Sequence, residues 1–218
     1  MNEPTTYPPA SSLPPAGQAV LLLVTEKSQV RAVLRRVLAD WTGLPPQKLP
    51  LRETSRGPRW IGPLAGDFLD ISISYCGQEA WLGLLRGGSI GIDAMPLEPI
   101  PEAAEVASHY FSPKVRAALQ QSPDPIRAFA IAWTELEARL KCLKRDLTEW
   151  SPAREDLTAP CVIQNFVSSD ATVITAALIP FPPAVGLTSH PPGVGPKGCY
   201  RCYIVDSQAF KVLQMVLQ

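Results

Sequence analysis

Residues 125–145 read PIRAFAIAWTELEARLKCLKR, and they form the longest stretch of helical periodicity in the chain. Apolar side chains recur here every three or four residues, which predicts one long helix that buries a single stripe. On the same count, Glu137 and Lys141 stand one turn apart at the edge of that stripe. Two interpretations of these charges stay open: a surface ion pair and a place in a functional site. The stripe consists of Phe129, Ala132, Trp133, Leu136, Leu140 and Leu143.

The segments around this helix predict strands and shorter helices. Residues 28–41 repeat Val and Leu at helical spacing, whereas residues 68–75, FLDISISY, alternate apolar and polar side chains as a strand does. Gly87 and Gly88 predict a tight turn into a strand that ends at Asp93, where a short carboxylate can point into a cleft. This order indicates an α+β fold with a mostly antiparallel sheet. The other predicted elements are strands over 19–24, 80–85, 161–166, 172–179 and 200–205, helices over 102–110 and from 112 onward, and a short amphipathic helix at the C-terminus.

Length and composition narrow the classes of protein to consider. The chain has 218 residues with 46% hydrophobic content, enough for one large domain or two small lobes around a sizeable core. Lys plus Arg equals Asp plus Glu at 20 each, so no overall charge favours nucleic acid or an anionic membrane. No apolar run approaches the ~20 residues that span a bilayer. Residues 1–17 are proline-rich and predict a disordered tail, not a secretory signal. We therefore expect a cytoplasmic protein with no nucleic acid or membrane partner.

The sequence offers little for other kinds of site. Its five cysteines are odd in number and scattered, which is typical of reduced thiols in a cytosol. Cys199 and Cys202 have the spacing of half a zinc or redox site, but no second pair or nearby His completes it, so we expect ordinary strand cysteines. The two histidines, His109 and His190, do not adjoin a nucleophile motif, and there is no glycine-rich loop of the Walker or dinucleotide type.

Five short motifs follow one another in a recognisable order. They are RGPR at 56–59, ISYCG at 73–77, GID at 91–93, YFS at 110–112 and WTELEARLK at 133–141. Together they resemble the signature of the surfactin-type 4′-phosphopantetheinyl transferases, which consists of G-[KR]-P, [IL]-S-H-S-G, G-[IV]-D, F-[FY]-S and W-[ST]-x-K-E-[AS]-x-x-K. Each piece is a weak signal, and the order of all five makes the resemblance specific.

This resemblance implies a reaction and an architecture. Enzymes of this family move 4′-phosphopantetheine from coenzyme A to a serine of an acyl or peptidyl carrier protein, in fatty acid, polyketide or nonribosomal peptide biosynthesis, and release adenosine 3′,5′-bisphosphate. They depend on Mg²⁺. Their fold is a pseudo-dimer of two similar lobes, each a mostly antiparallel sheet with a packed long helix, with a cleft between the lobes. For this chain the resemblance implies an N-terminal lobe over 18–93, a C-terminal lobe over 94–218, and a monomer that binds coenzyme A and a carrier protein.

The resemblance also assigns roles to single residues. Asp93 and Glu137 match the family's magnesium-binding carboxylates, whose hard oxygen atoms suit that ion. Glu137 also matches the base that helps to deprotonate the carrier serine, and Lys141 matches the lysine that steadies the pyrophosphate and the leaving group, so both are implied to be catalytic. The residues implied to bind the coenzyme are Ser74, Tyr75, Arg56, Asp93 and Lys141.

Several positions depart from the family pattern, and three of them lie within the quoted motifs or next to them. Met95 stands where the family has a second carboxylate two residues after the aspartate, and a thioether is a poor ligand for Mg²⁺. Tyr75 replaces a phosphate-contacting histidine, and Leu136 replaces a lysine. Two alternatives therefore stay open: an impaired relative that binds a carrier protein or coenzyme A without transfer, and an unrelated α+β protein whose motifs coincide by chance.

Overall fold

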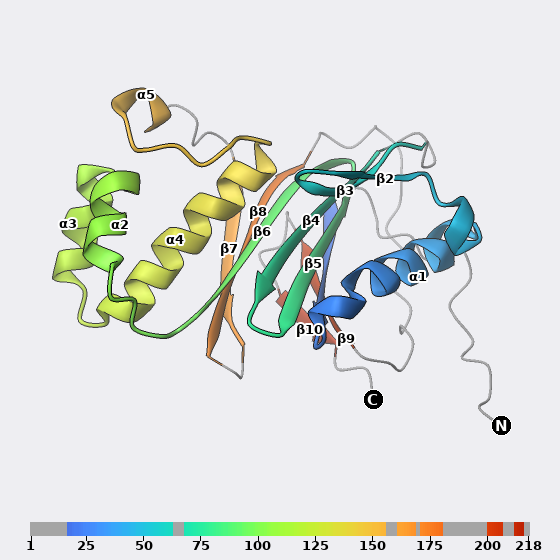
Figure 1. The fold of residues 1–218 in the computed structure, drawn as a ribbon, viewed down its shortest axis with the longest axis horizontal. Coiled ribbons are helices and arrows are strands. Elements are labelled where there is room, and N and C mark those ends of the chain that lie inside the picture. Colours follow the sequence, from blue (N-terminus) through green and yellow to red (C-terminus); the bar gives the residue numbers. More distant parts are fainter. Residues whose placement is uncertain are drawn as a thin grey trace. The chain divides into compact units, whose positions relative to one another are not determined.

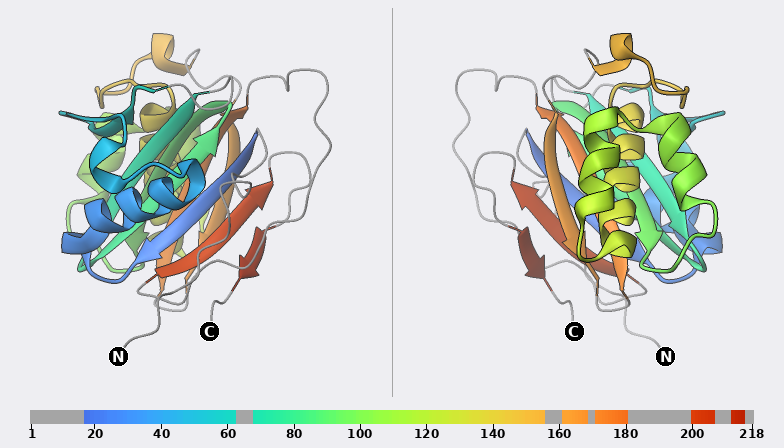
Figure 2. Two further views of the ribbon diagram at one scale, coloured as in Figure 1. Left: turned by 90° about the vertical axis from the view of Figure 1, so that its right-hand side faces the viewer. Right: turned by 90° about the vertical axis from the view of Figure 1, so that its left-hand side faces the viewer.

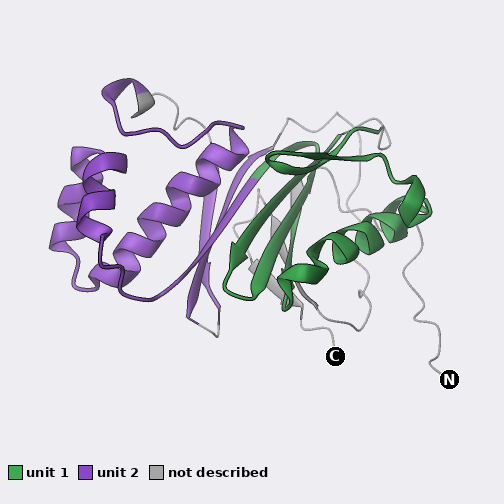
Figure 3. Cartoon of the chain, in the orientation of Figure 1, with its two compact units in different colours: residues 1–90, 180–218 green, residues 91–179 purple. Residues whose placement is uncertain are grey.

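The chain divides into two compact units in the computed structural model, which describes residues 17–62, 68–155, 161–168, 171–180, 200–206 and 212–215. Unit 1 consists of residues 1–90 and 180–218, and unit 2 of residues 91–179 (Figure 3). Apart from Gly17, the predicted tail over 1–17 lies outside the described residues. No helix in the described part of the chain is both long and apolar enough to cross a membrane.

Unit 1 is built on a five-stranded sheet in the order β10-β9-β1-β5-β4, with β1 antiparallel to both β5 and β9 (Figure 1). The helix α1 packs on this sheet and buries the apolar residues that the sequence places at helical spacing, which confirms that prediction. The elements are β1 (Gln18–Val24), α1 (Val30–Thr42), β4 (Leu69–Cys76), β5 (Glu79–Arg86), β9 (Tyr200–Asp206), β10 (Val212–Met215), the hairpin β2 (Leu51–Thr54) and β3 (Gly57–Trp60), and the 3₁₀ turns η2 (Lys27–Gln29) and η3 (Pro46–Lys48).

Unit 2 is a layer of helices on a three-stranded sheet in the order β6-β8-β7. Its longest helix, α4, lies between that sheet and the shorter helices α2 and α3 (Figure 2). The elements are β6 (Gly88–Pro96), which enters this unit at residue 91, α2 (Ala103–Tyr110), α3 (Pro113–Gln121), α4 (Pro125–Cys142), α5 (Pro152–Glu155), β7 (Val162–Val167) and β8 (Thr172–Pro180).

These sheets and helices confirm the α+β class, while the pseudo-dimer of two similar lobes stays a prediction. The lobe boundaries over 18–93 and 94–218 also stay a prediction. The two compact units are not two consecutive halves of the chain, because residues 180–218 belong to the same unit as residues 1–90. β9 pairs with β1 from Gln18↔Asp206 to Val24↔Tyr200, which joins the end of the chain to unit 1. The prediction of a C-terminal helix is wrong at residues 212–215, because they form β10, which pairs with β9.

The helix α4 has two packing faces where the sequence predicts one stripe. Phe129, Trp133 and Leu136, which belong to the predicted stripe, pack with Phe111 in a cluster that reaches α2 and α3. A second face of small residues, spaced by four, is buried as well and reaches the sheet through contacts with β8. Small side chains let a helix backbone approach a sheet closely, so these residues are core in spite of their size. This second face consists of Ala130, Thr134, Ala138 and Cys142.

Strand β6 approaches the backbone of α4 closely at Gly91. A Cβ atom added to this glycine would stand 1.9 Å from the carbonyl oxygen of Ala138 and 2.4 Å from the backbone nitrogen of Cys142. Both atoms belong to the helix backbone, so no side-chain rotation can make room. The glycine of the GID motif is therefore required by the packing of the strand against the helix.

We expect Gly91→Ala to destabilise the protein by about 3 kcal/mol or more, because overpacking against backbone forces the strand and helix apart. Urea unfolding of the purified chain measures this. Gly57→Ala is the matched control, since its φ of +102° is strained for alanine but its added Cβ meets nothing within 4 Å. That control should cost only about 1–2 kcal/mol. Equal losses for the two variants would contradict the close approach at Gly91.

Candidate functional site

Asp93 is a buried carboxylate on strand β6 of unit 2. It lies on β6 two residues after Gly91, and alternation along the strand turns both residues to the same face. That face meets the last turns of α4, because the Gly91 Cα faces the backbone of Ala138 and Cys142. The residue Asp93 is 7% exposed, so its charge depends on partners within the protein.

The partner that the helix supplies is Lys141. Its Nζ donates to Asp93 Oδ1 at 2.6 Å, a short charge-assisted hydrogen bond between residues 48 positions apart in the chain. The Asp93 side chain is 10% exposed and that of Lys141 33%, so the ion pair joins the interior of the unit to its surface. Lys141 thus contacts strand β6 directly. This contact supports the prediction that Lys141 and Asp93 belong to one site.

Glu137 lies on α4 one turn before Lys141 and is half-buried. Residues four apart share one side of a helix, so Glu137 and Lys141 occupy neighbouring positions along that side. Strand β6 and helix α4 run in opposite directions. Gly91 of β6 meets Ala138 and Cys142 near the end of α4, whereas Met95, later in the strand, packs with the cluster around Phe129, near the start of the helix.

Met95 is half-buried and packs against an apolar cluster. It packs against the cluster that contains Phe111 and Phe129, between β6 and the helices. By alternation Met95 shares the face of Asp93, and this is where the family pattern has a carboxylate. Its thioether therefore contributes to packing and offers no hard oxygen atom to a metal ion.

Asp93 and Glu137 supply the chemistry that a magnesium ion needs. Both offer carboxylate oxygen atoms, and Mg²⁺ in proteins is commonly held by one or two carboxylates together with waters and substrate phosphates. Among the described residues, no group of three or more His, Cys, Asp or Glu is placed to hold a metal. By donor chemistry, carboxylates at these two positions are the type of ligand that a magnesium site with two protein ligands would use.

Ser74, Tyr75 and Arg56 belong to unit 1. Ser74 on β4 is 4% exposed and lies opposite Trp81 of β5, whereas the next residue, Tyr75, is 51% exposed. Arg56 lies in the turn between β2 and β3, where its backbone N–H donates to Thr54 Oγ1 at 3.2 Å. The structure therefore brings Asp93 and Lys141 into contact within one unit and carries these three residues on the other.

A chain of polar side chains that the sequence did not reveal anchors α4 to the sheet; it is buried at Thr134 and Thr175 and reaches the surface at Asn165. The hydroxyl oxygen atoms of Thr134 and Thr175 are 2.7 Å apart, and Thr175 Oγ1 donates to Asn165 Oδ1 at 2.7 Å. Asn165 Nδ2 in turn donates to Glu135 Oε1 at 2.6 Å, which returns the chain to the helix. Thr134 and Glu135 belong to the WTELEARLK motif, but their partners lie 30 to 41 positions away, so no local pattern pointed to them.

The YFS motif at 110–112 also has a structural role. Phe111 is 4% exposed and contacts Phe129 and Trp133 edge-on, with ring centroids 5.7 and 6.2 Å apart. Ser112 caps α3, because its hydroxyl accepts from the backbone N–H of Val115 at 3.3 Å. The motif therefore turns the chain from α2 into α3 and fixes both helices against α4.

Comparison with known protein families identifies one match. Residues 89–177 match the family model described as the 4′-phosphopantetheinyl transferase superfamily. The matched range begins on β6 and ends on β8, and it contains Asp93, Glu137 and Lys141. No curated protein matches the chain.

We expect the Asp93–Lys141 contact to contribute a measurable coupling energy to folding. A double-mutant cycle with Asp93→Asn and Lys141→Met in urea unfolding should give about 1–3 kcal/mol, since Asp93 is largely withdrawn from water. The exposed pair Arg31–Glu53, 3.2 Å apart with side chains 38% and 55% exposed, is the matched control and should give under about 1 kcal/mol. Additive losses for Asp93 and Lys141 would contradict a direct ion pair.

Proposed function

Because residues 89–177 form a domain of the 4′-phosphopantetheinyl transferase superfamily, we propose that this chain transfers 4′-phosphopantetheine from coenzyme A to a serine of an acyl or peptidyl carrier protein. The transfer depends on Mg²⁺ and releases adenosine 3′,5′-bisphosphate. The observation that carries the proposal is the Asp93–Lys141 contact, which unites two charged positions of the family signature within the matched range.

Phosphoryl transfer needs charge placed around the diphosphate more than it needs covalent help from the protein. In our proposal Asp93 and Glu137 hold the magnesium ion through carboxylate oxygen atoms. The ion, when bound, neutralises charge on the diphosphate. Both residues stand on regular elements, β6 and α4, so their backbones are held by strand and helix hydrogen bonds.

Lys141 supplies positive charge that can serve two partners. In the structure its ammonium neutralises Asp93, and with one third of its side chain exposed it is open to a solvent-borne anion. A lysine ammonium has three donors, so contact with Asp93 leaves capacity for a phosphate oxygen. We assign Lys141 to the diphosphate and to the negative charge that develops on the leaving group.

Glu137 is the proposed base. It is half-buried one turn from Lys141, and a carboxylate in that position can take the proton from the carrier serine directly or through a water molecule. Ser74, Tyr75 and Arg56 are the residues of unit 1 that we assign to the coenzyme. A monomeric state and a cytoplasmic location stay predictions.

A second candidate function is binding of a carrier protein or coenzyme A without transfer. The packing of Met95 against the apolar cluster favours it, because the position that carries a ligand in the family pattern is here used for apolar packing. Transfer by the unmodified chain would exclude this candidate. Binding of a carrier protein with no change of its mass would support it.

The experiment is intact-protein mass spectrometry of apo carrier proteins incubated with the chain, coenzyme A and Mg²⁺. We expect the carrier to gain the mass of one phosphopantetheine, and we expect Asp93→Asn and Glu137→Gln each to lower the rate by about 10²–10³, as loss of a charge-stabilising group does. Chelation of divalent ions by EDTA should stop the transfer.

Glu135→Gln is the matched control, since it changes the same type of side chain on the same helix two residues away. Its amide oxygen can still accept from Asn165 Nδ2, so we expect the rate to change less than about threefold. Full activity of Glu137→Gln would contradict the proposed role of that residue. No mass gain on any carrier from the source genome would contradict transfer itself.

A further inference from the structure

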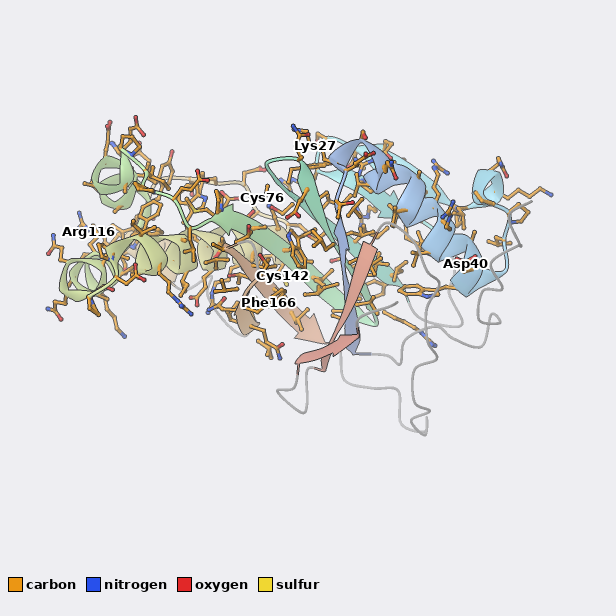
Figure 4. The ribbon with its side chains drawn as sticks, turned by 90° about the horizontal axis from the view of Figure 1, so that it is seen from below. Lys27, Asp40, Cys76, Arg116, Cys142 and Phe166 are labelled. Carbon is orange, nitrogen blue, oxygen red and sulfur yellow. The ribbon has the colours of Figure 1, made fainter. Side chains whose placement is uncertain are left out.

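Two thiols meet at the end of α4, where Cys142 directly follows Lys141 in the chain. Cys142 is the last residue of the helix and is 2% exposed (labelled in Figure 4), while Cys161 directly precedes β7 and is half-buried. They pack in one small cluster with Ala138, Ala177 and Ile163, and the two side chains are hydrogen-bonded to each other. Both belong to unit 2, so their proximity is a feature of a single compact unit.

The surroundings favour the thiolate form of Cys161. The S–H of Cys142 donates to the sulfur of Cys161, and this hydrogen bond lowers the pKa of Cys161. Burial raises the pKa, and the positive charge of the nearby Arg139 guanidinium lowers it further. The net effect is a pKa of about 7. The hydrophobic side chains that pack with the two thiols are Ala138 on the helix and Ile163, Ala177 and Ile179 on the strands. The contact with Cys142 and the charge of Arg139 therefore favour the thiolate of Cys161, which is the reactive form of a cysteine.

We propose that Cys161 and Cys142 form a redox-active pair, in which Cys161 is the nucleophile toward hydrogen peroxide and Cys142 is the resolving thiol. The arrangement has the parts such a pair needs: one accessible, ionisable thiol, a second thiol in contact with it, and a cation beside them. This inference is independent of the proposed transferase reaction.

The reaction balances without any further reagent. The Cys161 thiolate attacks one oxygen atom of hydrogen peroxide, the O–O bond breaks, and Cys161 becomes a sulfenic acid while hydroxide leaves and takes a proton to form water. Cys142 sulfur then attacks the Cys161 sulfur, the S–O bond breaks, and a second water carries away the oxygen and the Cys142 proton. The sum is two thiols and one peroxide to one disulfide and two waters, and a dithiol reductant reverses it.

The disulfide would join the last turn of α4 to the start of β7. That turn carries Lys141, which precedes Cys142 and holds Asp93, and its backbone nitrogen at Cys142 faces Gly91. The cross-link closes the intervening segment, 143–160, into a loop, and a loop of that length restricts the unfolded chain appreciably. We therefore expect oxidation to raise the thermal midpoint of the full chain.

The first test treats the reduced full chain with hydrogen peroxide and maps its peptides by mass spectrometry. We expect a linked peptide pair containing Cys142 and Cys161, lighter by two hydrogen atoms than the separate peptides and released by dithiothreitol. Cys161→Ser should abolish it, whereas Cys76→Ser, a change at a half-buried cysteine of unit 1, should leave it intact. Absence of the linked pair in the unmodified chain would overturn the proposal.

The second test separates the two roles of Cys142 by alkylation of Cys161 with iodoacetamide across a pH series. In the unmodified chain the rate should rise through a midpoint near pH 7, where an ordinary thiol has its midpoint near 8.5. Cys142→Ser keeps a hydrogen-bond donor and should keep that midpoint, while Cys142→Ala removes the donor and should move it upward. In both variants peroxide should leave a sulfenic acid on Cys161 that dimedone traps.

A midpoint near 8.5 in the unmodified chain, or the same midpoint in the Ser and Ala variants, would overturn the proposed contact between the thiols. Circular dichroism of each variant in reductant confirms that the fold is retained. The Cys161→Ser result stands on its own if a change at buried Cys142 prevents folding, because Cys161 is only half-buried.

Discussion

At Gly91, strand β6 passes so close to helix α4 that one added carbon atom would stand 1.9 Å from the Ala138 carbonyl oxygen. This backbone contact sets the distance and the register between the two elements. Two residues further along the same face, Asp93 meets Lys141 at 2.6 Å. A bulkier residue at position 91 would push the strand away from the helix and break that ion pair. The contact between Asp93 and Lys141 therefore depends on the absence of a side chain at position 91.

The helix α4 is suited to carry such a site because its two packing faces hold it from both sides. Its small residues pack on the sheet, where Thr134 is hydrogen-bonded to Thr175. On the other face, Phe129 and Trp133 stack on each other in the cluster that includes residues of α2. Glu137 and Lys141 are left on an edge between interior and solvent. Charged groups on an immobilised helix keep their positions when a substrate arrives, which is what electrostatic stabilisation of a phosphoryl transfer requires.

Local periodicity was enough to predict most of the fold. It placed α1 with its buried residues, the β4–β5 hairpin and α4, whose C-terminal end it extended by three residues beyond Cys142. It missed the second face of α4, because Ala, Thr and Cys at intervals of four do not stand out as an apolar stripe. It also missed β10, since pairing between distant strands leaves no mark on a short segment. Of the site, the motif order predicted Asp93 and Lys141, but only the structure supplies their contact.

In our proposal, the Asp93–Lys141 edge of unit 2 receives the diphosphate of coenzyme A. Calorimetric titration of the chain with coenzyme A, and separately with pantetheine, which lacks the diphosphate, tests it most directly when repeated on Lys141→Met. We expect this variant to bind coenzyme A about tenfold or more weakly, the equivalent of one charge-assisted contact, and to bind pantetheine unchanged. Equal affinity of the variant and the unmodified chain for coenzyme A would contradict it.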